Sequence, residues 1–402
     1  MQVKNRKVIC KSKLLFFLYF AILTIGDNMN SIIDSLKNLD EQSRKKLMIF
    51  GISFVGIIIL IIIISIIVSI VNRRTSYEDM EEIMEKAAYN YYQQNLGQLP
   101  TETVKTTVIS AQTLVEQEYM KEISKYTKDE SCSGNVIVTY YDGEYDYQGY
   151  LTCNDFTTSL LVDKIKKDNV VVTSGAGLYD ESGLLRFRGE HINNYLKIGD
   201  VLYRIIKIDT ENKIYITPND LDDYDDNSRI YWDDRYNSID DMSTGINDYS
   251  MSRAREGLNN IYDNFDKELK KYLVNYNLCV NKRAETDVNN DGSVECGKII
   301  EKQKIALLPI YEYIKASIAP SCVSTKTKEC KNYNYLVMED KGWWTLTADS
   351  SSTSHIYFIN SSGEIDREKG NNKKLGRYVL ALKPNTLFKT GEGTLEKPYE
   401  IR

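Results

Sequence analysis

The sequence is poor in histidine, since its 402 residues include only His191 and His355. This scarcity argues against a zinc cluster, because the imidazole of histidine is a common zinc ligand. The chain also lacks a GxGxxG run, a phosphate-binding loop ending in Gly-Lys-Ser/Thr, and two glycines spaced four apart around a nucleophile. These absences give no support to a nucleotide-binding enzyme or to a serine hydrolase with a nucleophile elbow.

Positive charge is not in excess either. The 51 lysines and arginines are outnumbered by 57 acidic residues, which gives a net charge of −6. Because the basic residues are interspersed with acids, nucleic acid is not expected as a partner. The apolar content of 42% is typical of a globular protein, and 30 tyrosines against 10 phenylalanines indicate half-buried β surfaces.

One apolar run is unusually long. Residues 47–71 contain no charged side chain and are mostly isoleucine, which is long enough for a helix to cross a hydrocarbon layer of about 30 Å. Basic residues flank the run on both sides, as they often flank membrane spans. We therefore predict a single transmembrane helix over 47–71, with membrane lipid as a partner. The alternative interpretation is a buried core helix.

The cysteines orient this predicted span. Six of the seven follow it, and disulfides persist in oxidising compartments. This distribution predicts a single-pass protein of the cell membrane, with a cytoplasmic segment over 1–46 and an extracellular C-terminus. A second apolar stretch, Leu14 to Ile25, is short for a span. One explanation is that Met29 is the true start, with residues 1–28 an untranslated leader, because Gly26 to Asn28 can be encoded by a purine-rich ribosome-binding sequence.

Residues 75–155 are expected to form a small stalk domain of helices and a β-hairpin. A capping box at Thr75 to Glu78 predicts the start of an amphipathic helix. A second amphipathic segment runs from roughly Ser110 to Tyr126. A helix followed by a sheet resembles the layout of pilin-like proteins, although no prepilin cleavage motif is present.

The hairpin is predicted by Asp142-Gly143, which lies between two β-prone runs and is typical of a two-residue turn. In that register Tyr141 faces Glu144, and Cys132 lies opposite Cys153 in a non-hydrogen-bonded pair. The Cα atoms of such a pair are about 4.5 Å apart, a distance that a disulfide tolerates. We therefore predict a disulfide between Cys132 and Cys153.

After a linker at about 155–176, residues 178–402 are expected to form a surface domain of the α+β class with a mainly antiparallel sheet. The remaining cysteines are expected to pair with their sequence neighbours, Cys279 with Cys296 and Cys322 with Cys330. Helices are expected near Ser252–Tyr276 and Pro309–Ser317. The clearest β runs are Val201–Ile208, Lys213–Pro218, His355–Ile359 and Tyr378–Leu382.

Several stretches of this domain carry a family resemblance. They begin at Tyr195 (YLKIGDVLYRII), Ile230 (IYWDDRYN), Ala306 (ALLP), Gly342 (GWWTLT) and Gly391 (GEGTLEKPY). These stretches resemble an uncharacterised domain of anchored surface proteins in low-GC gram-positive bacteria, which is distantly similar to the C-type-lectin-like fold of formylglycine-generating enzymes. The resemblance implies a surface module, without a known reaction.

Trp343 and Trp344 are candidate binding residues. Successive side chains of a strand point to opposite faces, so one indole is expected to face inward and the other outward. An outward indole can stack on a sugar or hold a partner protein. Plain surface packing is the competing interpretation.

The segment beginning at Asp287 matches the first eight positions of a calcium loop, with a glycine at position 6. Position 12, however, is Lys298 instead of a bidentate glutamate. If this loop binds calcium, we expect a weak site, with a dissociation constant on the order of 0.1 to 1 mM. The alternative is a polar turn closed by a disulfide. The candidate ligands are Asp287, Asn289, Asp291, Ser293 and Glu295.

The function favoured by these features is a membrane-anchored extracellular binding or adhesion protein without catalytic activity, whose ligand is a glycan or a protein. One alternative is a cell-surface enzyme that acts on envelope polymers through acids such as Asp233, Asp234 or Glu312. Another is a structural component similar to a minor pilin. No catalytic residue is predicted, because the proximity of His355 to a serine-rich segment is typical of a loop.

Overall fold

The computed structural model describes residues 40–42, 58–59, 61–62, 75–141, 143–221 and 229–402. The chain divides into two compact units, Met1–Thr75 and Ser76–Arg402. The second unit is mixed α+β and contains several sheets.

The predicted transmembrane helix needs correction. Among the residues that the structure describes, no helix is both long and apolar enough to cross a bilayer. The longest described helix, α4 (Tyr77–Gln94), carries five acidic residues and a lysine, namely Glu78, Asp79, Glu81, Glu82, Glu85 and Lys86. The fold class with a membrane span, and the single-pass membrane localisation drawn from it, are therefore wrong for the described chain.

The physical reason for this error is that only apolar composition and flanking basic residues supported the span. Composition shows that a segment is hydrophobic, but it does not show that the segment forms one continuous helix. Most of 47–71 lies outside the described residues, as do the stretch from Leu14 to Ile25 and the alternative start at Met29.

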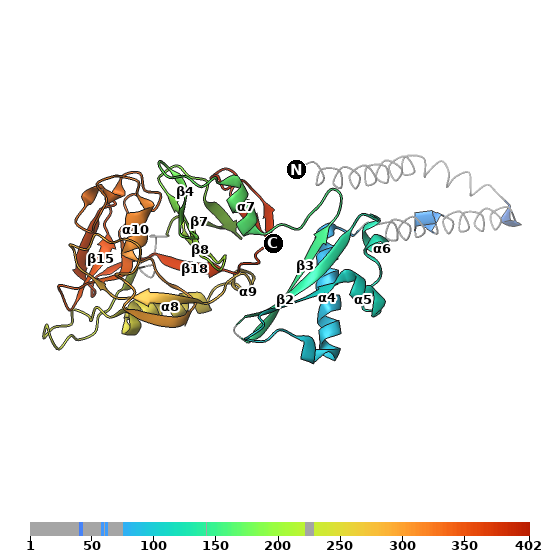
Figure 1. The fold of residues 1–402 in the computed structure, drawn as a ribbon, viewed down its shortest axis with the longest axis horizontal. Coiled ribbons are helices and arrows are strands. Elements are labelled where there is room, and N and C mark those ends of the chain that lie inside the picture. The colour runs from blue at the N-terminus through green and yellow to red at the C-terminus, as the bar shows by residue number, and fades with distance from the viewer. Residues whose placement is uncertain (1–39, 43–57, 60, 63–74, 142, 222–228) are drawn as a thin grey trace. The chain divides into compact units, whose positions relative to one another are not determined.

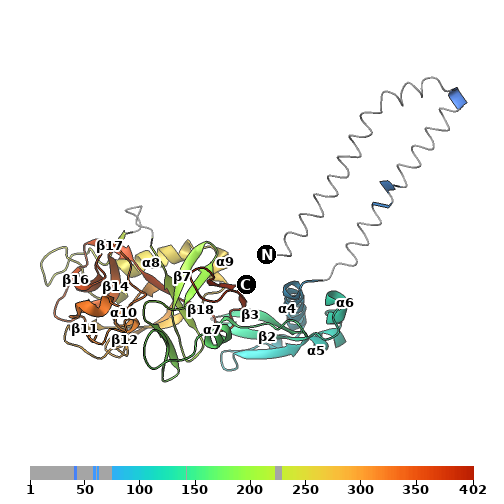
Figure 2. The same ribbon diagram turned by 90° about the horizontal axis from the view of Figure 1, so that it is seen from above.

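The first part of the second unit packs helices against a three-stranded antiparallel sheet (Figures 1 and 2). Ser76 caps α4 by accepting a hydrogen bond from the Asp79 amide at 3.1 Å, one residue later than the predicted capping box. The segment predicted to be one helix over 110–126 is two short helices. The other elements are η1 (Leu96–Gln98), β1 (Thr106–Ser110), α5 (Ala111–Glu116), α6 (Ile123–Thr127), β2 (Ser133–Tyr141) and β3 (Glu144–Thr152).

The hairpin of β2 and β3 has the predicted register. Tyr141 pairs with Glu144, and the pairing continues to Ser133 and Thr152. One step further out, Cys132 and Cys153 form the predicted disulfide, with a Cα–Cα distance of 4.1 Å. The other two predicted disulfides are present as well, between Cys279 and Cys296 and between Cys322 and Cys330.

A nine-stranded sheet organises much of the remaining chain. Its hydrogen-bonded order is β13-β18-β8-β7-β6-β20-β19, and β5 joins β7 on one side and β4 on the other. Most pairings are antiparallel, but β20 runs parallel to β6. The bounds are β4 (Gly177–Glu181), β5 (Leu184–Arg188), β6 (Tyr195–Ile198), β7 (Val201–Ile208), β8 (Ile214–Pro218), β13 (Ala306–Leu307), β18 (Tyr378–Leu382), β19 (Phe388–Thr390) and β20 (Tyr399–Ile401).

A six-stranded sheet and a two-stranded sheet complete the β structure. In the six-stranded sheet, β14 is central and pairs with β15, β17 and β11. The bounds in this sheet are β9 (Arg229–Tyr231), β11 (Lys282–Arg283), β14 (Trp343–Asp349), β15 (His355–Ile359), β16 (Ile365–Lys369) and β17 (Lys373–Gly376). The two-stranded sheet consists of β10 (Tyr276–Val280) and β12 (Lys298–Gln303).

Short helices cover these sheets. The predicted helix over 309–317 is α10 (Ile310–Ala316), but the one predicted over 252–276 divides into α8 (Arg253–Asp263) and α9 (Lys267–Lys270). The segment interpreted as a linker contains α7 (Leu161–Asp168), whose Leu161, Val162 and Ile165 are buried in the main core. The remaining 3₁₀ helices are η3 (Tyr249–Met251) and η4 (Lys328–Lys331).

Candidate functional site

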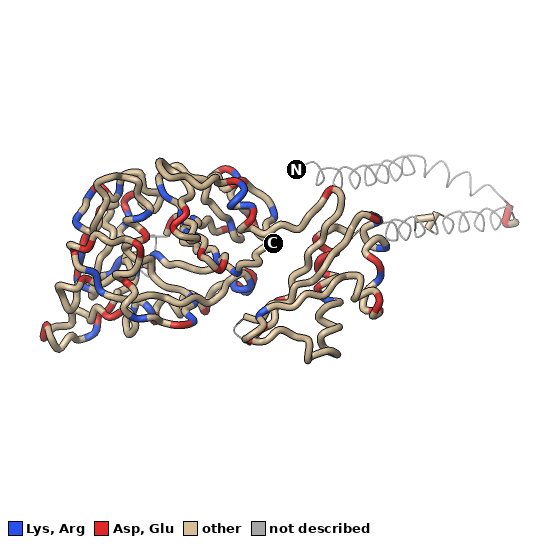
Figure 3. Tube along the Cα trace, viewed as in Figure 1, with Lys and Arg blue, Asp and Glu red and all other residues tan. Residues whose placement is uncertain are grey.

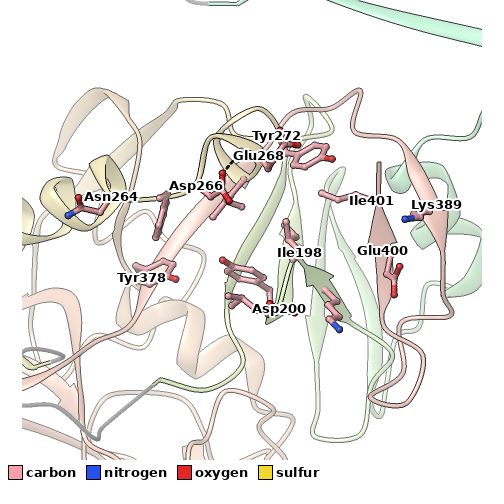
Figure 4. Close-up of a pocket in the computed structure, with 16 residues that line it drawn as sticks. Ile198, Asp200, Asn264, Asp266, Glu268, Tyr272, Tyr378, Lys389, Glu400 and Ile401 are labelled. Atoms are coloured by element: carbon pink, nitrogen blue, oxygen red, sulfur yellow. Dashed lines mark hydrogen bonds between the residues drawn. The ribbon is translucent and has the colours of Figure 1, made fainter. Parts of the chain in front are cut away.

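A pocket of about 640 Å³ lies beside the β6–β7 hairpin (Figure 4). This volume falls within the range of about 300 to 1,000 Å³ that is usual for small-ligand sites. The hairpin turn consists of Gly199 and Asp200, and the positive φ of 58° at Gly199 is a conformation that a two-residue turn requires. The lining residues are Lys197, Ile198, Gly199, Asp200, Val201, Tyr203, Asn264, Phe265, Asp266, Glu268, Leu269, Tyr272, Tyr378, Lys389, Glu400 and Ile401.

Aromatic side chains from separate elements meet in this pocket. Tyr203 is on β7, Tyr378 is on β18, and Phe265 and Tyr272 lie on either side of α9. Figure 4 shows Tyr272 at the top and Tyr378 at the left of the same space, with Ile198 lower in the middle and Ile401 to its right. Long-range folding is therefore needed to assemble the site.

The phenols of Tyr203 and Tyr378 are hydrogen-bonded to each other. Burial raises the pKa of Tyr203 above its usual range, and burial together with the neighbouring phenol raises the pKa of Tyr378. Both phenols therefore stay neutral at physiological pH, and they present an apolar ring with a polar tip to the pocket.

Carboxylates outnumber lysines in the lining. The lining contains four acids, Asp200, Asp266, Glu268 and Glu400, but only two lysines, Lys197 and Lys389. Two of the acids already have partners, because Asp266 accepts the Glu268 amide at 3.0 Å and Glu268 contacts Lys271 at 2.6 Å. Over the C-terminal part as a whole, charges of both signs are interspersed (Figure 3).

The predicted binding residues lie elsewhere. Trp343 and Trp344 are both 0% exposed. The Trp344 indole donates to the Ile230 carbonyl at 3.1 Å, and the Trp343 ring packs edge-on against Tyr313. Every residue of β14 is buried, so this strand is covered on both faces. Neither indole is placed to stack on a ligand at the surface.

The candidate calcium loop is organised around a guanidinium group. Arg283 is fully buried, and its Nη1 contacts Glu295 Oε1 at 2.8 Å. Its Nη2 donates to the carbonyls of Asp287 at 3.1 Å and Asn289 at 2.8 Å, and to Asn290 Oδ1 at 2.6 Å. One oxygen of Glu295 and the main-chain oxygens of Asp287 and Asn289 are thus already bound to an internal cation.

The other candidate ligands take part in local turns. Asp287 Oδ2 accepts the Ala284 amide at 2.7 Å, and Asp291 Oδ1 accepts the Ser293 amide at 2.8 Å. Asn289 Nδ2 donates to Ser293 Oγ at 3.0 Å. In the described residues, the group with ligand atoms close enough for a metal is Asp129 with Cys132 and Cys153, whose two sulfurs form a disulfide.

This arrangement changes the expectation for calcium. Adding several millimolar calcium to the purified chain is expected to shift the thermal midpoint by less than about 1 °C, because Arg283 occupies the interior of the loop. Differential scanning fluorimetry with magnesium at equal ionic strength as the control measures this shift. A calcium-specific rise of several degrees that Asp291→Ala abolishes would contradict the prediction.

The residues considered for catalysis do not form one centre. Ser352 Oγ lies 2.7 Å from His355 Nδ1, but the same oxygen accepts the amides of Ser354 and His355 in a local turn. Asp233 is buried against Arg235, and Glu312 is buried against Arg186 and Lys207. None of these side chains lines the 640 Å³ pocket.

The pocket residues were not identified from the sequence. They come from separate stretches of the chain, and no single motif contains all of them. Six lie within the stretch that begins at Tyr195 (YLKIGDVLYRII), but that stretch carried only a family resemblance and did not indicate a pocket. The excess of tyrosine indicated half-buried aromatic surface without placing it. Comparison of the chain with protein-family models, curated proteins and solved structures gives no match.

Proposed function

We propose that residues 178–402 act as a non-catalytic binding module, and that the pocket beside the β6–β7 hairpin takes a segment of a neutral oligosaccharide. The observation that carries this proposal is the meeting of the half-buried Tyr272 and Tyr378 in one pocket of about 640 Å³, with the buried Tyr203 behind them. Aromatic rings offer flat apolar faces to the C–H side of a sugar ring, and their hydroxyl groups can exchange hydrogen bonds with its hydroxyls.

The charge of the lining supports a neutral ligand over an acidic one. Asp200 and Glu400 add carboxylate oxygens that can accept hydrogen bonds from sugar hydroxyls. Sulfated or carboxylated sugars would instead be repelled by the excess of carboxylates. The module is therefore expected to discriminate between neutral and anionic glycans.

A glycan array probed with the full chain tests this proposal. We expect saturable binding to neutral oligosaccharides and no release of fragments on prolonged incubation. Binding confined to cationic peptides, or release of sugar fragments, would contradict it. Isothermal titration with the best array ligand then gives the affinity for the variants.

Tyr272→Ala is expected to weaken oligosaccharide binding by about tenfold or more. Tyr272 is partly exposed at the pocket, and aromatic side chains at the centre of a binding site commonly contribute about 2 kcal/mol or more. Tyr236→Ala is the matched control, because Tyr236 is 56% exposed and does not line the pocket. Equal affinities for both variants and the unmodified chain would exclude this pocket as the binding site.

A further inference from the structure

Two buried arginines have no carboxylate partner. The described residues include four buried arginines. Arg186 contacts Glu181 and Glu312, and Arg283 contacts Glu295. The other two, Arg204 and Arg377, are 3% and 0% exposed and form no ion pair in the described chain. Because a buried charge without a counter-ion is costly, this difference calls for an explanation.

Arg204 lies on β7 in the nine-stranded sheet. It pairs with Tyr195 on the neighbouring strand β6 and with Thr217 on the other neighbour, β8. Its guanidinium carbon is 3.7 Å from the centre of the Tyr195 ring and 5.0 Å from that of the Tyr335 ring. These rings cover the flat faces of the guanidinium. Its Nε and Nη2 atoms, which form one edge of the group, are buried and have no hydrogen-bond acceptor.

A third donor is unused nearby. The hydroxyl of Tyr335, a residue that is 7% exposed, is buried and has no hydrogen-bond partner. Burial raises the pKa of Tyr335 to about 12, so the phenol keeps its proton at neutral pH. Arg204 lies against the Tyr335 ring, and the charges of Arg204, Arg186 and Arg377 oppose the rise in the pKa of Tyr335.

Arg377 adds a second positive charge that only neutral groups contact. Its side chain donates to the Leu336 carbonyl, to the Pro218 carbonyl at 3.3 Å and to Thr217 Oγ1 at 3.4 Å. Burial lowers the pKa of Arg377 to about 10, and repulsion by Arg204 contributes to this decrease. The group therefore remains charged at neutral pH. The charge of Asp220 raises the pKa of Arg377, but Asp220 is exposed and contacts Lys341 at 2.7 Å.

We propose that a small monovalent anion, a halide or a simple carboxylate, binds at the Nε/Nη2 edge of Arg204 and the hydroxyl of Tyr335, with Arg377 adding charge. Three features of this region support the site: an unused guanidinium edge, an unused phenol donor and a second cation without an ion pair. Two N–H groups on one edge of a guanidinium match the two oxygens of a carboxylate, and the same edge suits a halide. The site is separate from the proposed sugar pocket, whose lining includes none of these three residues.

Thermal unfolding of the full chain tests the proposal. Samples at equal ionic strength contain chloride, formate or gluconate, the last being too large for a buried site. Since ligand binding to the folded state raises stability by mass action, chloride or formate at about tenfold its dissociation constant is expected to raise the midpoint by about 3 °C over gluconate. A crystal grown with bromide should show anomalous density against Arg204 and Tyr335 if the site takes halides, and a formate-only response identifies it as a carboxylate site.

Two variants and a control make the test specific. Arg204→Met keeps the side-chain length and should abolish the anion-dependent rise, and Tyr335→Phe should weaken the apparent affinity by about tenfold. Arg253→Met, at a side chain that is 52% exposed, should respond as the unmodified chain does. If Arg204→Met does not fold, Tyr335→Phe decides the result. A midpoint independent of the anion in the unmodified chain, or an unchanged response in Tyr335→Phe, would overturn the proposal.

Discussion

Arg283→Met is expected to lower the free energy of unfolding by about 3–5 kcal/mol, the usual cost of removing one partner of a buried ion pair. The side chains of Arg283 and Glu295 are 0% and 1% exposed and lie 2.8 Å apart. Methionine fills a similar volume but leaves the Glu295 carboxylate buried without its cation. It also leaves the carbonyls of Asp287 and Asn289 without a donor.

Urea unfolding followed by tryptophan emission measures this loss, because Trp232, Trp343 and Trp344 are all fully buried in the same hydrophobic core. The control is Arg253→Met, whose side chain is 52% exposed and contacts Asp234 at 3.5 Å. An exposed pair of this kind contributes at most about 1 kcal/mol. Similar stabilities for the two variants would show that Arg283 does not organise the loop.

The loss should also depend on pH. Burial raises the pKa of Glu295 above its usual value, and the Arg283 charge opposes this rise. Without Arg283 the folded-state pKa of Glu295 rises further, so the folded variant binds a proton that the unfolded chain has released. The stability of the variant then falls as pH increases from the unfolded-state pKa of Glu295 to its folded-state pKa. The difference between Arg283→Met and the unmodified chain should therefore be smaller at pH 5 than at pH 8.

Features set by local geometry were predictable from the sequence. The Asp142-Gly143 turn determines the register of β2 and β3, and that register places Cys132 opposite Cys153. The run of β-branched and aromatic residues in Val201–Ile208 similarly identifies β7 with its observed bounds. In each case the interactions that determine the structure lie within about 20 residues of one another.

Features set by tertiary packing were not predictable in the same way. Strand alternation assigns Trp343 and Trp344 to opposite faces of β14, but it cannot show that other elements cover both faces. The spacing of oxygen ligands from Asp287 onward matched a calcium loop. The pattern does not include Arg283, which lies outside those positions and binds the main-chain carbonyls of Asp287 and Asn289 and the Glu295 carboxylate. The predicted transmembrane helix failed for a related reason, because it rested on apolar composition and flanking basic residues and on no tertiary information.

Glu312→Gln is the second substitution with a large expected effect. The Glu312 side chain is 2% exposed and contacts two cations, Arg186, which is 3% exposed, and Lys207, whose Nζ lies 2.6 Å from Glu312 Oε1. Glutamine keeps the shape of the side chain but removes its negative charge. The buried Arg186 and the half-buried Lys207 then lose their shared counter-ion, and the expected loss below pH 7 is about 3–5 kcal/mol.

The matched control for this substitution is Glu181→Gln. Glu181 contacts the same arginine at 3.0 Å and Lys315 at 3.3 Å, but its side chain is 25% exposed. Water can therefore replace part of the interaction, and the expected loss is about 1 kcal/mol or less. A comparison of the two variants separates the effect of burial from that of removing a carboxylate beside Arg186.

The pH dependence of Glu312→Gln should have the opposite sign to that of Arg283→Met. Burial lowers the pKa of Lys207 to about 7, and the charge of Arg186 contributes to the decrease. In the unfolded chain the lysine pKa is about 10.4, so the folded state binds fewer protons between these values and its stability rises with pH there.

Above pH 7 the buried amine is neutral, and losing Glu312 affects only Arg186. The destabilisation should therefore be larger at pH 6 than at pH 9, as measured by urea unfolding against the unmodified chain at each pH. An equal loss at both pH values would contradict the prediction, because it would show that the charge of Lys207 does not change between pH 6 and pH 9.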